Sequence, residues 1–472
     1  MRAAATAFLL CAPALALAQA PQPASPAAAA APEQKPGPLT LTQLQDLARR
    51  NDPRAGQARA QLQVAEAKRD EVYWATSFPT ITASLAIAGP APEARLVHGR
   101  DGAGVEHPTS LLDVTPGSRC YFCGHLGIGI GFTANTVLPL YTFGKGTSGR
   151  LATGYLVGAM SALVQRSTDQ ATFDVTRAYW GYQTARGAGT TILDVRRRLA
   201  ETKDRARKLL AEESDQVSKS DAMKLDYLAE DIEARNADSE KGAALALTAI
   251  RLIIGKAPED PIDIVEQKLP DPPAPPDERE TLRRALERRP EARAAAAQVA
   301  GRRAALDLER AKLYPDLALI IGGTYNYTSS AENPPTPFAY NPYNQQNIYL
   351  ALAFQGSFDI PQKMARIRQS EAELGDALAQ QRGAEQLIRL EVRQAVGDLQ
   401  DARIRAERYG NESVIGKRLV VQAGLAFDSG LGEARELMED MLLWARADGE
   451  KFRALFDAQI AWAALQKATG GL

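Results

Sequence analysis

The histidines and cysteines of this chain gather in one segment. All three histidines and two of the three cysteines lie between residues 89 and 125, at His98, His107, Cys120, Cys123 and His125. Cysteines of exported proteins usually pair, so a tight Cys120–Cys123 disulfide is one interpretation. Thiolates and imidazoles also bind zinc and copper, so a labile metal site with the histidines is a second, and free thiols are a third. Composition alone does not support the metal site, and we expect no bound metal or cofactor.

Other motifs that suggest enzyme chemistry fail on spacing. The segment 143–147 resembles a phosphate-binding loop, but that loop needs a glycine five residues before Gly144, where Pro139 stands. It also needs Ser or Thr directly after the lysine, where this chain has another glycine. Haem attachment requires a histidine directly after the second cysteine, whereas Gly124 follows Cys123. We therefore expect that this chain is not an enzyme.

The charge balance excludes a further class of protein. Lys and Arg number 56 and Asp and Glu number 57 among 472 residues, which leaves a net charge of −1. Nucleic-acid binders usually carry a clear basic excess. We expect no nucleic-acid partner.

The N-terminus predicts export. Arg2 precedes an apolar, alanine-rich run that ends in Ala16-Leu17-Ala18, with small residues at the two positions that a signal peptidase recognises. We interpret residues 1–18 as a signal peptide, with a disordered alanine-rich tail as the alternative. Residues 19–38 are rich in proline and alanine, which is typical of an extended linker.

The remaining chain is an internal duplication. Similar short segments recur in the same order in residues 39–255 and 277–472, and a proline-rich linker, 256–276, separates them. Each half predicts helix, strand, loop, strand, long helix, turn and long helix.

Four segments alternate between apolar and small or polar residues, at 80–87, 126–135, 316–327 and 347–355. This period of two over about ten residues is typical of a membrane β-barrel strand with one face toward lipid and one toward a wet lumen. Thr82, Thr133 and Asn326 are expected to face the lumen, and a charge at Ile128, near mid-membrane, is expected to be costly. The alternative is two half-buried soluble hairpins. The predicted lipid face contains Leu85, Ile87, Ile128, Ile130, Leu319, Ile321, Leu350 and Leu352.

The helical segments are too long for a compact domain. Residues 146–212, 219–254, 362–425 and 433–468 contain no proline. The first of these, at about 1.5 Å per residue, would span about 100 Å. Their thin apolar stripes favour coiled-coil packing with another face in water.

Closure of the sheet predicts oligomerisation. Four strands leave two open edges, which lipid does not tolerate. Single-chain barrels need at least eight strands, so two or more protomers must contribute, and three would give a barrel of twelve strands. The predicted fold class is an α+β membrane protein, a trimeric 12-stranded barrel with four strands per protomer that continues into a long α-helical barrel.

The repeated motifs identify a family. In their order and duplication the chain resembles the TolC-type outer-membrane efflux proteins over residues 39–472. The motifs are Asn51-Asp52-Pro53 and Arg288-Arg289-Pro290, Phe78-Pro79 and Tyr314-Pro315, Pro139-Leu140-Tyr141, and Ala468-Thr469-Gly470.

The resemblance implies a homotrimer in the outer-membrane lipid whose helical part lies in the periplasm. It implies an exit duct of a tripartite efflux or type I secretion system, joined to an inner-membrane pump by a periplasmic adaptor protein. A soluble periplasmic coiled-coil adaptor or scaffold is the alternative function, and the four amphipathic strands argue against it.

The hairpin tips, near 213–221 and 426–432, are the candidate periplasmic gate. Ser218 and Asp221 match a capping box, which is the structural alternative for Asp221. The resemblance places aperture acids at Asp221, Glu436 and Glu439. The two glutamates are three residues apart and so share a helix face, where a trimer would present two acidic rings that favour cations; a solvated charged face is the alternative.

Two positions depart from the family's gate. Gly432 stands where the gate-holding arginine would be, and Phe427 stands where a tyrosine would bond. We expect other contacts to hold the closed state, with Arg435 to Asp221 or Glu436 as one suggestion. Gly430 and Gly432 are expected to let the tip bend.

Overall fold

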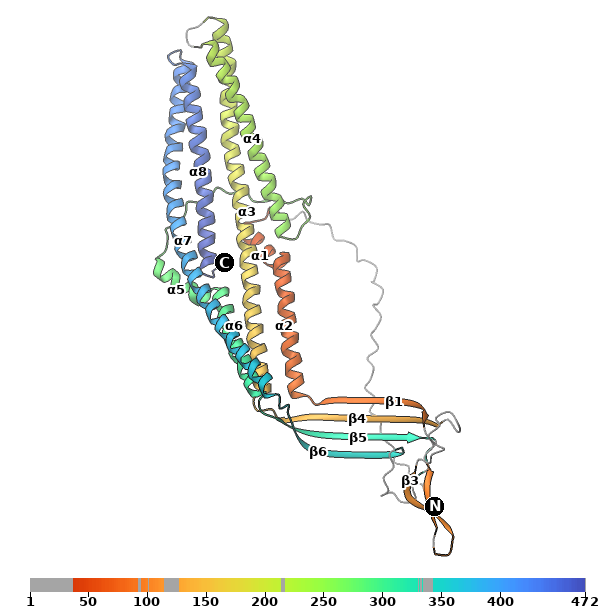
Figure 1. Cartoon of the computed structure of the whole chain (residues 1–472). Helices are drawn as coiled ribbons and strands as arrows, with labels where there is room; N and C mark the ends of the chain where they lie inside the picture. Colours follow the sequence, from red (N-terminus) through yellow and green to blue (C-terminus); the bar gives the residue numbers. More distant parts are fainter. Residues whose placement is uncertain are drawn as a thin grey trace.

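The computed structural model describes residues 37–472, apart from 92–94, 101, 114–126, 214–216, 330, 332, 334–342 and 472. The protomer is elongated, and two long helical hairpins rise from one end of a four-stranded sheet (Figure 1). The predicted signal peptide and nearly all of the 19–38 linker lie outside the described residues.

The two halves of the chain share one order of elements, and a short β-hairpin interrupts the first half. The first half contains α1 (Leu41–Asn51), α2 (Pro53–Ser77), β1 (Thr80–Ala91), β2 (Arg95–Arg100), β3 (Glu106–Asp113), β4 (Gly127–Tyr141), α3 (Lys145–Ala211) and α4 (Lys219–Ile253). The second contains α5 (Glu278–Arg288), α6 (Pro290–Ala311), β5 (Asp316–Thr328), β6 (Gln345–Gln355), α7 (Ile360–Asp428) and α8 (Ala434–Ala468).

Equivalent turns lie between the first two helices of each half and after its last helix. Asp52 caps α2 by accepting a 2.7 Å hydrogen bond from the Arg54 amide, and α6 likewise begins with a proline directly after its cap residue. Gly255 follows α4 with a positive φ of 76° and packs on Asn51. Gly470 follows α8 with a φ of 70° and packs on Arg288, so the two glycines take up the same position in their halves.

The sheet has the strand order β1-β4-β5-β6, and every neighbouring pair is antiparallel. Ile87 pairs with Ile130, and Ile321 pairs with both Thr136 and Leu350. Directly paired residues share a face. The register therefore places all eight residues of the predicted lipid set on one face, and most of their side chains are exposed in the single chain.

The opposite face of the sheet is polar. Thr82, Thr133 and Asn326 lie on it, as expected from the alternation. The Ser84 and Thr133 hydroxyls lie 2.5 Å apart, and Thr82 Oγ1 donates to the Asn135 carbonyl at 3.3 Å. A single chain thus carries a sheet with one apolar and one hydrophilic face.

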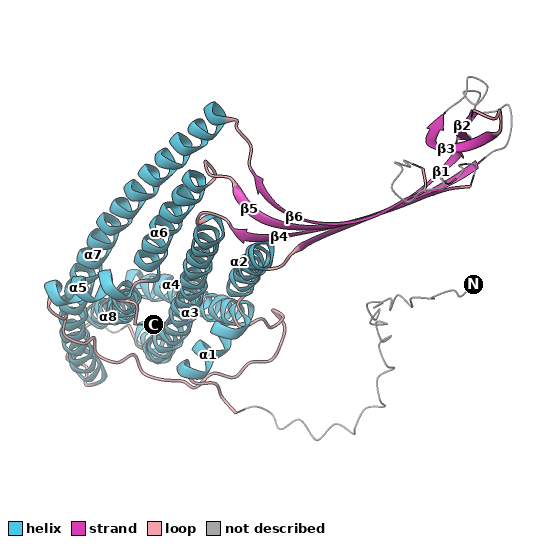
Figure 2. Cartoon of the chain, turned by 90° about the horizontal axis from the view of Figure 1, so that it is seen from below, coloured by secondary structure: helices cyan, strands magenta, loops and turns pink. Residues whose placement is uncertain are grey.

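Two expectations for the strands need correction. Ile128 is the second residue of β4, so it lies at the end of the sheet that is far from the helices and not near the middle of the strand. The β2–β3 hairpin was not predicted, and it projects from the far end of the sheet (Figure 2). Its register pairs His98 with Pro108 and Gly99 with His107. Its polar sequence lacks the apolar alternation that marks the four long strands, which explains why periodicity missed it.

The two helical hairpins stand side by side in the order α7, α8, α3, α4 (Figure 1). Helix α3 has 67 residues and α7 has 69. Each pairs with its own partner, α4 or α8, and the hairpins contact each other mainly through α3 and α8. Helices α4 and α7 therefore form the two outer edges. None of the described helices combines the length and hydropathy that a bilayer crossing requires.

Thin buried stripes hold the hairpins together. Near the tips, Leu225, Leu228 and Ile232 of α4 belong to one buried cluster with Met441 and Trp444 of α8. Gly416 of α7 faces the Trp444 backbone, and a Cβ there would lie 3.0 Å from the Trp444 Cα. Helix α7 can approach α8 closely at this point because position 416 has no side chain.

Candidate aperture and pore-lining site

The hairpin tips lie farthest from the sheet (Figure 1). Helix α3 ends at Ala211 and α4 begins at Lys219. Helix α7 ends at Asp428 and α8 begins at Ala434. The four helix ends converge there, so the candidate gate residues of both halves lie in one region.

Asp221 has a capping role. Its carboxylate accepts the Ser218 amide at 3.1 Å, and its own amide donates to the Ser218 hydroxyl at 3.1 Å. The hydrogen bond from the Ser218 side chain, together with the nearby charges of Lys224 and Arg435, lowers the pKa of Asp221. The capping box thus accounts for this acid locally, and no aperture role is needed to explain it.

Phe427 anchors the second tip. Its side chain is buried, and the Arg205 guanidinium of α3 lies 5.7 Å from the ring centroid. Arg205 also reaches the end of α7, where Nη2 donates to the Asp428 carbonyl at 2.5 Å and Nη1 lies 3.2 Å from the Asp428 carboxylate. This arginine therefore ties the first hairpin to the second beside the tip.

Sequence reasoning missed Arg205 because the contact joins residues 223 positions apart. The suggested alternative, Arg435, instead lies 3.5 Å from Glu433, and both side chains are exposed. The charge of Arg435 still helps to lower the pKa of Asp221, although no ion pair joins these two described residues.

Local backbone geometry and packing explain why positions 430 and 432 are glycine. Gly430 has a φ of 83°, which few other residues adopt. The Leu431 and Gly432 amides both donate to the Ala426 carbonyl, at 2.9 and 3.0 Å, and so close the end of α7. A Cβ at Gly432 would lie 2.9 Å from the Ala426 Cβ. These glycines form a closed, capped turn, and this packing contains nothing that requires the tip to bend.

Glu436 and Glu439 lie exposed on the first turns of α8. Asp440, which the sequence analysis did not single out, is half-buried beside them. Burial, followed by the charges of Glu436 and Glu439, raises the pKa of Asp440. The three acids thus share one electrostatic environment, and Glu439 also lines a groove of about 740 Å³ between α4 and α8.

A buried polar network around Asp448 connects the two hairpins at a point farther from the tip. Asp448 of α8 is 6% exposed. It accepts hydrogen bonds from Thr191 of α3 and Ser413 of α7, each at 2.5 Å, and Lys451 lies 3.5 Å away. Three helices therefore converge on one carboxylate, and no local sequence signal marks this site.

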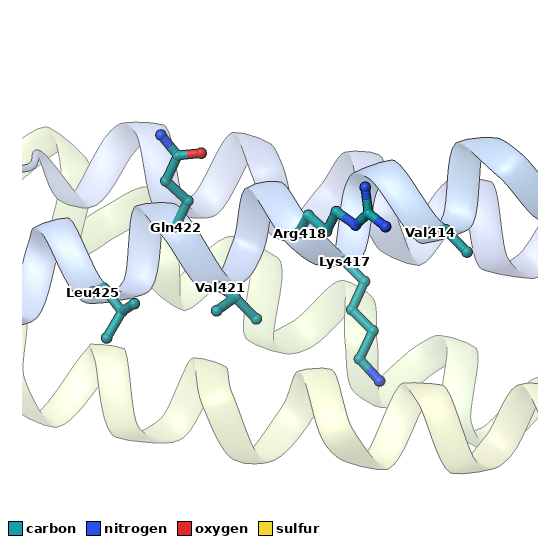
Figure 3. Close-up of a pocket in the computed structure, with 6 residues that line it drawn as sticks. All are labelled: Val414, Lys417, Arg418, Val421, Gln422 and Leu425. Atoms are coloured by element: carbon teal, nitrogen blue, oxygen red, sulfur yellow. The ribbon is translucent and has the colours of Figure 1, made fainter.

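A shallow groove of about 570 Å³ runs along the outer edge of α7. Figure 3 shows Lys417, Val421 and Leu425 on one side of the helix. Val421 is 44% and Leu425 67% exposed. On the opposite edge, Met223 and Tyr227 of α4 are also exposed. Both edges of the protomer thus carry uncovered apolar side chains.

The candidate loop cluster is only partly described. Cys120, Cys123 and His125 lie outside the described residues, and the side chains of His98 and His107 are not described either. Among the residues that the structure does describe, no three His, Cys, Asp or Glu side chains gather as a metal ion would require. The disulfide and the metal site both stay predictions.

Comparison with known proteins gives a family match within the second half of the chain and a fold for nearly the whole chain. The family model of the outer membrane efflux protein matches residues 281–471. No curated protein matches the sequence.

Solved structures match nearly the whole chain. The outer-membrane protein VceC of Vibrio cholerae is 15% identical, with a TM-score of 0.67, over 91% of this chain and 96% of its own. The outer-membrane channel MtrE of Neisseria gonorrhoeae, in its open state, is 16% identical, with a TM-score of 0.71, over 91% and 89%. The CmeC outer-membrane channel of Campylobacter jejuni is 12% identical, with a TM-score of 0.70, over 91% and 85%.

Proposed function

We propose that this chain, a TolC-like outer-membrane efflux protein by the family match of its second half and by its fold, is the exit duct of a tripartite efflux or type I secretion system. It is a protein of the outer membrane whose helical part lies in the periplasm, and it is a passive channel, not an enzyme. The two-faced sheet is the observation that carries the proposal.

The sheet supports a closed barrel. Its edge strands β1 and β6 have no neighbour on their outer sides in the described protomer, and its apolar face is uncovered. Pairing β1 of one copy with β6 of the next would satisfy both edges, and three copies would give twelve strands. The apolar face would then contact outer-membrane lipid, and the polar face would line the lumen.

The helices support the same assembly. The apolar side chains on the edges of α4 and α7 would cover each other between neighbouring copies of a homotrimer. Twelve long helices would then continue the barrel as a tunnel into the periplasm. A soluble adaptor would not need the apolar sheet face.

The remaining assignments belong to this proposal. The chain would consist of the signal peptide 1–18, the linker 19–38, two repeats at 39–255 and 277–472, and the linker 256–276 around the equator. Its partners would be a periplasmic adaptor and an inner-membrane pump, which supplies the energy for transport.

The acids of α8 are proposed to make the periplasmic aperture cation-selective. Replacing Glu436 and Glu439 by glutamine removes six negative charges from a trimer while keeping side-chain size. In planar bilayers we expect lower cation selectivity and loss of block by divalent cations added from the periplasmic side.

Glu412→Gln is the matched control for the aperture acids, because Glu412 is an exposed acid of α7 away from the tip. It is expected to leave both properties unchanged. If the double variant also leaves them unchanged, Glu436 and Glu439 are surface charges without an aperture role.

Export itself tests the function. A strain that lacks the chain should accumulate a substrate of its pump, and the wild-type chain should restore export. Normal export in the deletion strain, with no other outer-membrane duct present, would contradict the proposal.

A further inference from the structure

Tyr349 crosses the polar face of the sheet. It lies on β6 opposite Gly322 of β5, and Gly322 in turn lies opposite Asn135 of β4. The Tyr349 hydroxyl reaches past β5 and lies 3.0 Å from Asn135 Oδ1. Because this one side chain reaches from β6 across β5 to β4, its ring lies flat against the polar face of the sheet.

Gly322 provides the space for this ring. A Cβ built on Gly322 would overlap the Tyr349 ring and would lie 2.5 Å from its hydroxyl oxygen. The backbone at Gly322 does not have the positive φ that only glycine adopts freely. An alanine there is thus compatible with the backbone, and the three atoms nearest to its Cβ all belong to the Tyr349 side chain.

Most other residues of this face are small, and Asp316 is the one charged residue among its paired positions. Tyr349 is its only aromatic residue among the paired positions, and Asp316, at the helical end, is paired with Lys145 at 2.8 Å. The other paired residues are Thr80, Thr82, Ser84, Ala86, Ala88, Gly129, Gly131, Thr133, Asn135, Val137, Pro139, Ala318, Ile320, Gly322, Thr324, Asn326, Thr328, Gln345, Asn347, Ala351, Ala353 and Gln355.

We propose that Tyr349, held against the wall by Gly322 and Asn135, is the residue that sets the width of the barrel passage. The inference rests on the proposed function, in which the polar face lines the lumen. A ring displaced from the Gly322 notch has no space within the wall and projects into the passage. Three displaced rings, one from each protomer, narrow the passage, whereas rings held in the notch leave it wide. Because the one acid among the paired positions of this face, Asp316, is neutralised by Lys145, this section selects solutes by size and not by charge.

The test is polymer exclusion in planar bilayers. Polyethylene glycols of graded size, added only on the outer side, lower the conductance when they enter the barrel. The largest size that does so reports the local width of the passage. Gly322→Ala is expected to lower this cutoff, and Gly322→Ala with Tyr349→Ala is expected to restore it.

Gly323→Ala is the matched control. Gly323 is the neighbouring residue on the opposite face, and a Cβ there would meet only the Asn347 carbonyl oxygen, at 3.8 Å. It is expected to keep the wild-type cutoff. A merely structural role for Gly322 would not predict rescue by removal of the tyrosine ring.

The outcomes separate the two proposals. A wild-type chain that forms no pore overturns the proposed function and this inference together. A wild-type pore with an unchanged cutoff in Gly322→Ala, or with a lowered cutoff that Tyr349→Ala does not restore, overturns this inference alone. If Gly322→Ala does not assemble, Asn135→Val takes its place, because it removes the partner of the Tyr349 hydroxyl and leaves the space at Gly322 open. A lowered cutoff in Asn135→Val supports the inference, and an unchanged cutoff overturns it.

Discussion

Replacing Leu85 by lysine is expected to destabilise the assembled barrel by about 2–4 kcal/mol, whereas replacing its neighbour Ser84 by lysine is expected to cost less than about 1 kcal/mol. Leu85 lies near the middle of β1 on the apolar face and is 67% exposed in the single chain. Ser84 lies at the same depth on the polar face. A lysine at 85 would face hydrocarbon, and a lysine at 84 would face water.

The measurement is the denaturant midpoint of the purified assembly in lipid vesicles. Leu85→Ala controls for lost packing, since it shortens the side chain without adding charge. Equal destabilisation by Leu85→Lys and Ser84→Lys would refute the assigned faces. Ile128→Lys is expected to cost less than Leu85→Lys, because the penalty falls toward the membrane surface and Ile128 lies at the outer end of β4.

Arg205→Ala is expected to raise the open fraction of the channel by about two orders of magnitude. Arg205 is the tie between α3 and the end of α7, through the Phe427 ring and the Asp428 carbonyl. A partly exposed contact of this kind contributes about 1 kcal/mol. If three copies open together, the closed state of the variant would be less stable by about 3 kcal/mol. Each 1.4 kcal/mol changes the ratio of open to closed channels by a factor of ten.

Open probability in planar bilayers measures this effect. Arg207→Ala is the control, because Arg207 lies on the same helix and its charge partner, Asp204 at 3.9 Å, is on that helix too. It is expected to behave as wild type. If Arg205→Ala also has the wild-type open probability, the tie does not hold the gate and the closed state depends on other contacts.

Local sequence signals predicted the elements well. The period-two alternation located all four long strands, although β4 extends to Tyr141, beyond the predicted end at 135. Proline-free stretches located the four long helices within a few residues. The capping box at Ser218 and Asp221 was visible because all its atoms lie within one turn. These features depend on neighbouring residues alone.

Non-local contacts could not be predicted in the same way. The tie from Arg205 to Asp428 and the convergence of Thr191 and Ser413 on Asp448 depend on which helices pack side by side and in which register. The Tyr349–Gly322–Asn135 contact likewise depends on strand register. In sequence each of these residues is an ordinary polar, aromatic or small residue of its element.

The mass of the purified assembly in mild detergent shows whether three chains form one barrel. The two-faced sheet has open edges at β1 and β6 in the described protomer, and we expect that three protein chains close them. Light scattering that separates protein from detergent should give three times the mass of one chain in the outer-membrane fraction. A monodisperse monomer that remains folded would contradict the account, since four strands alone cannot enclose a pore.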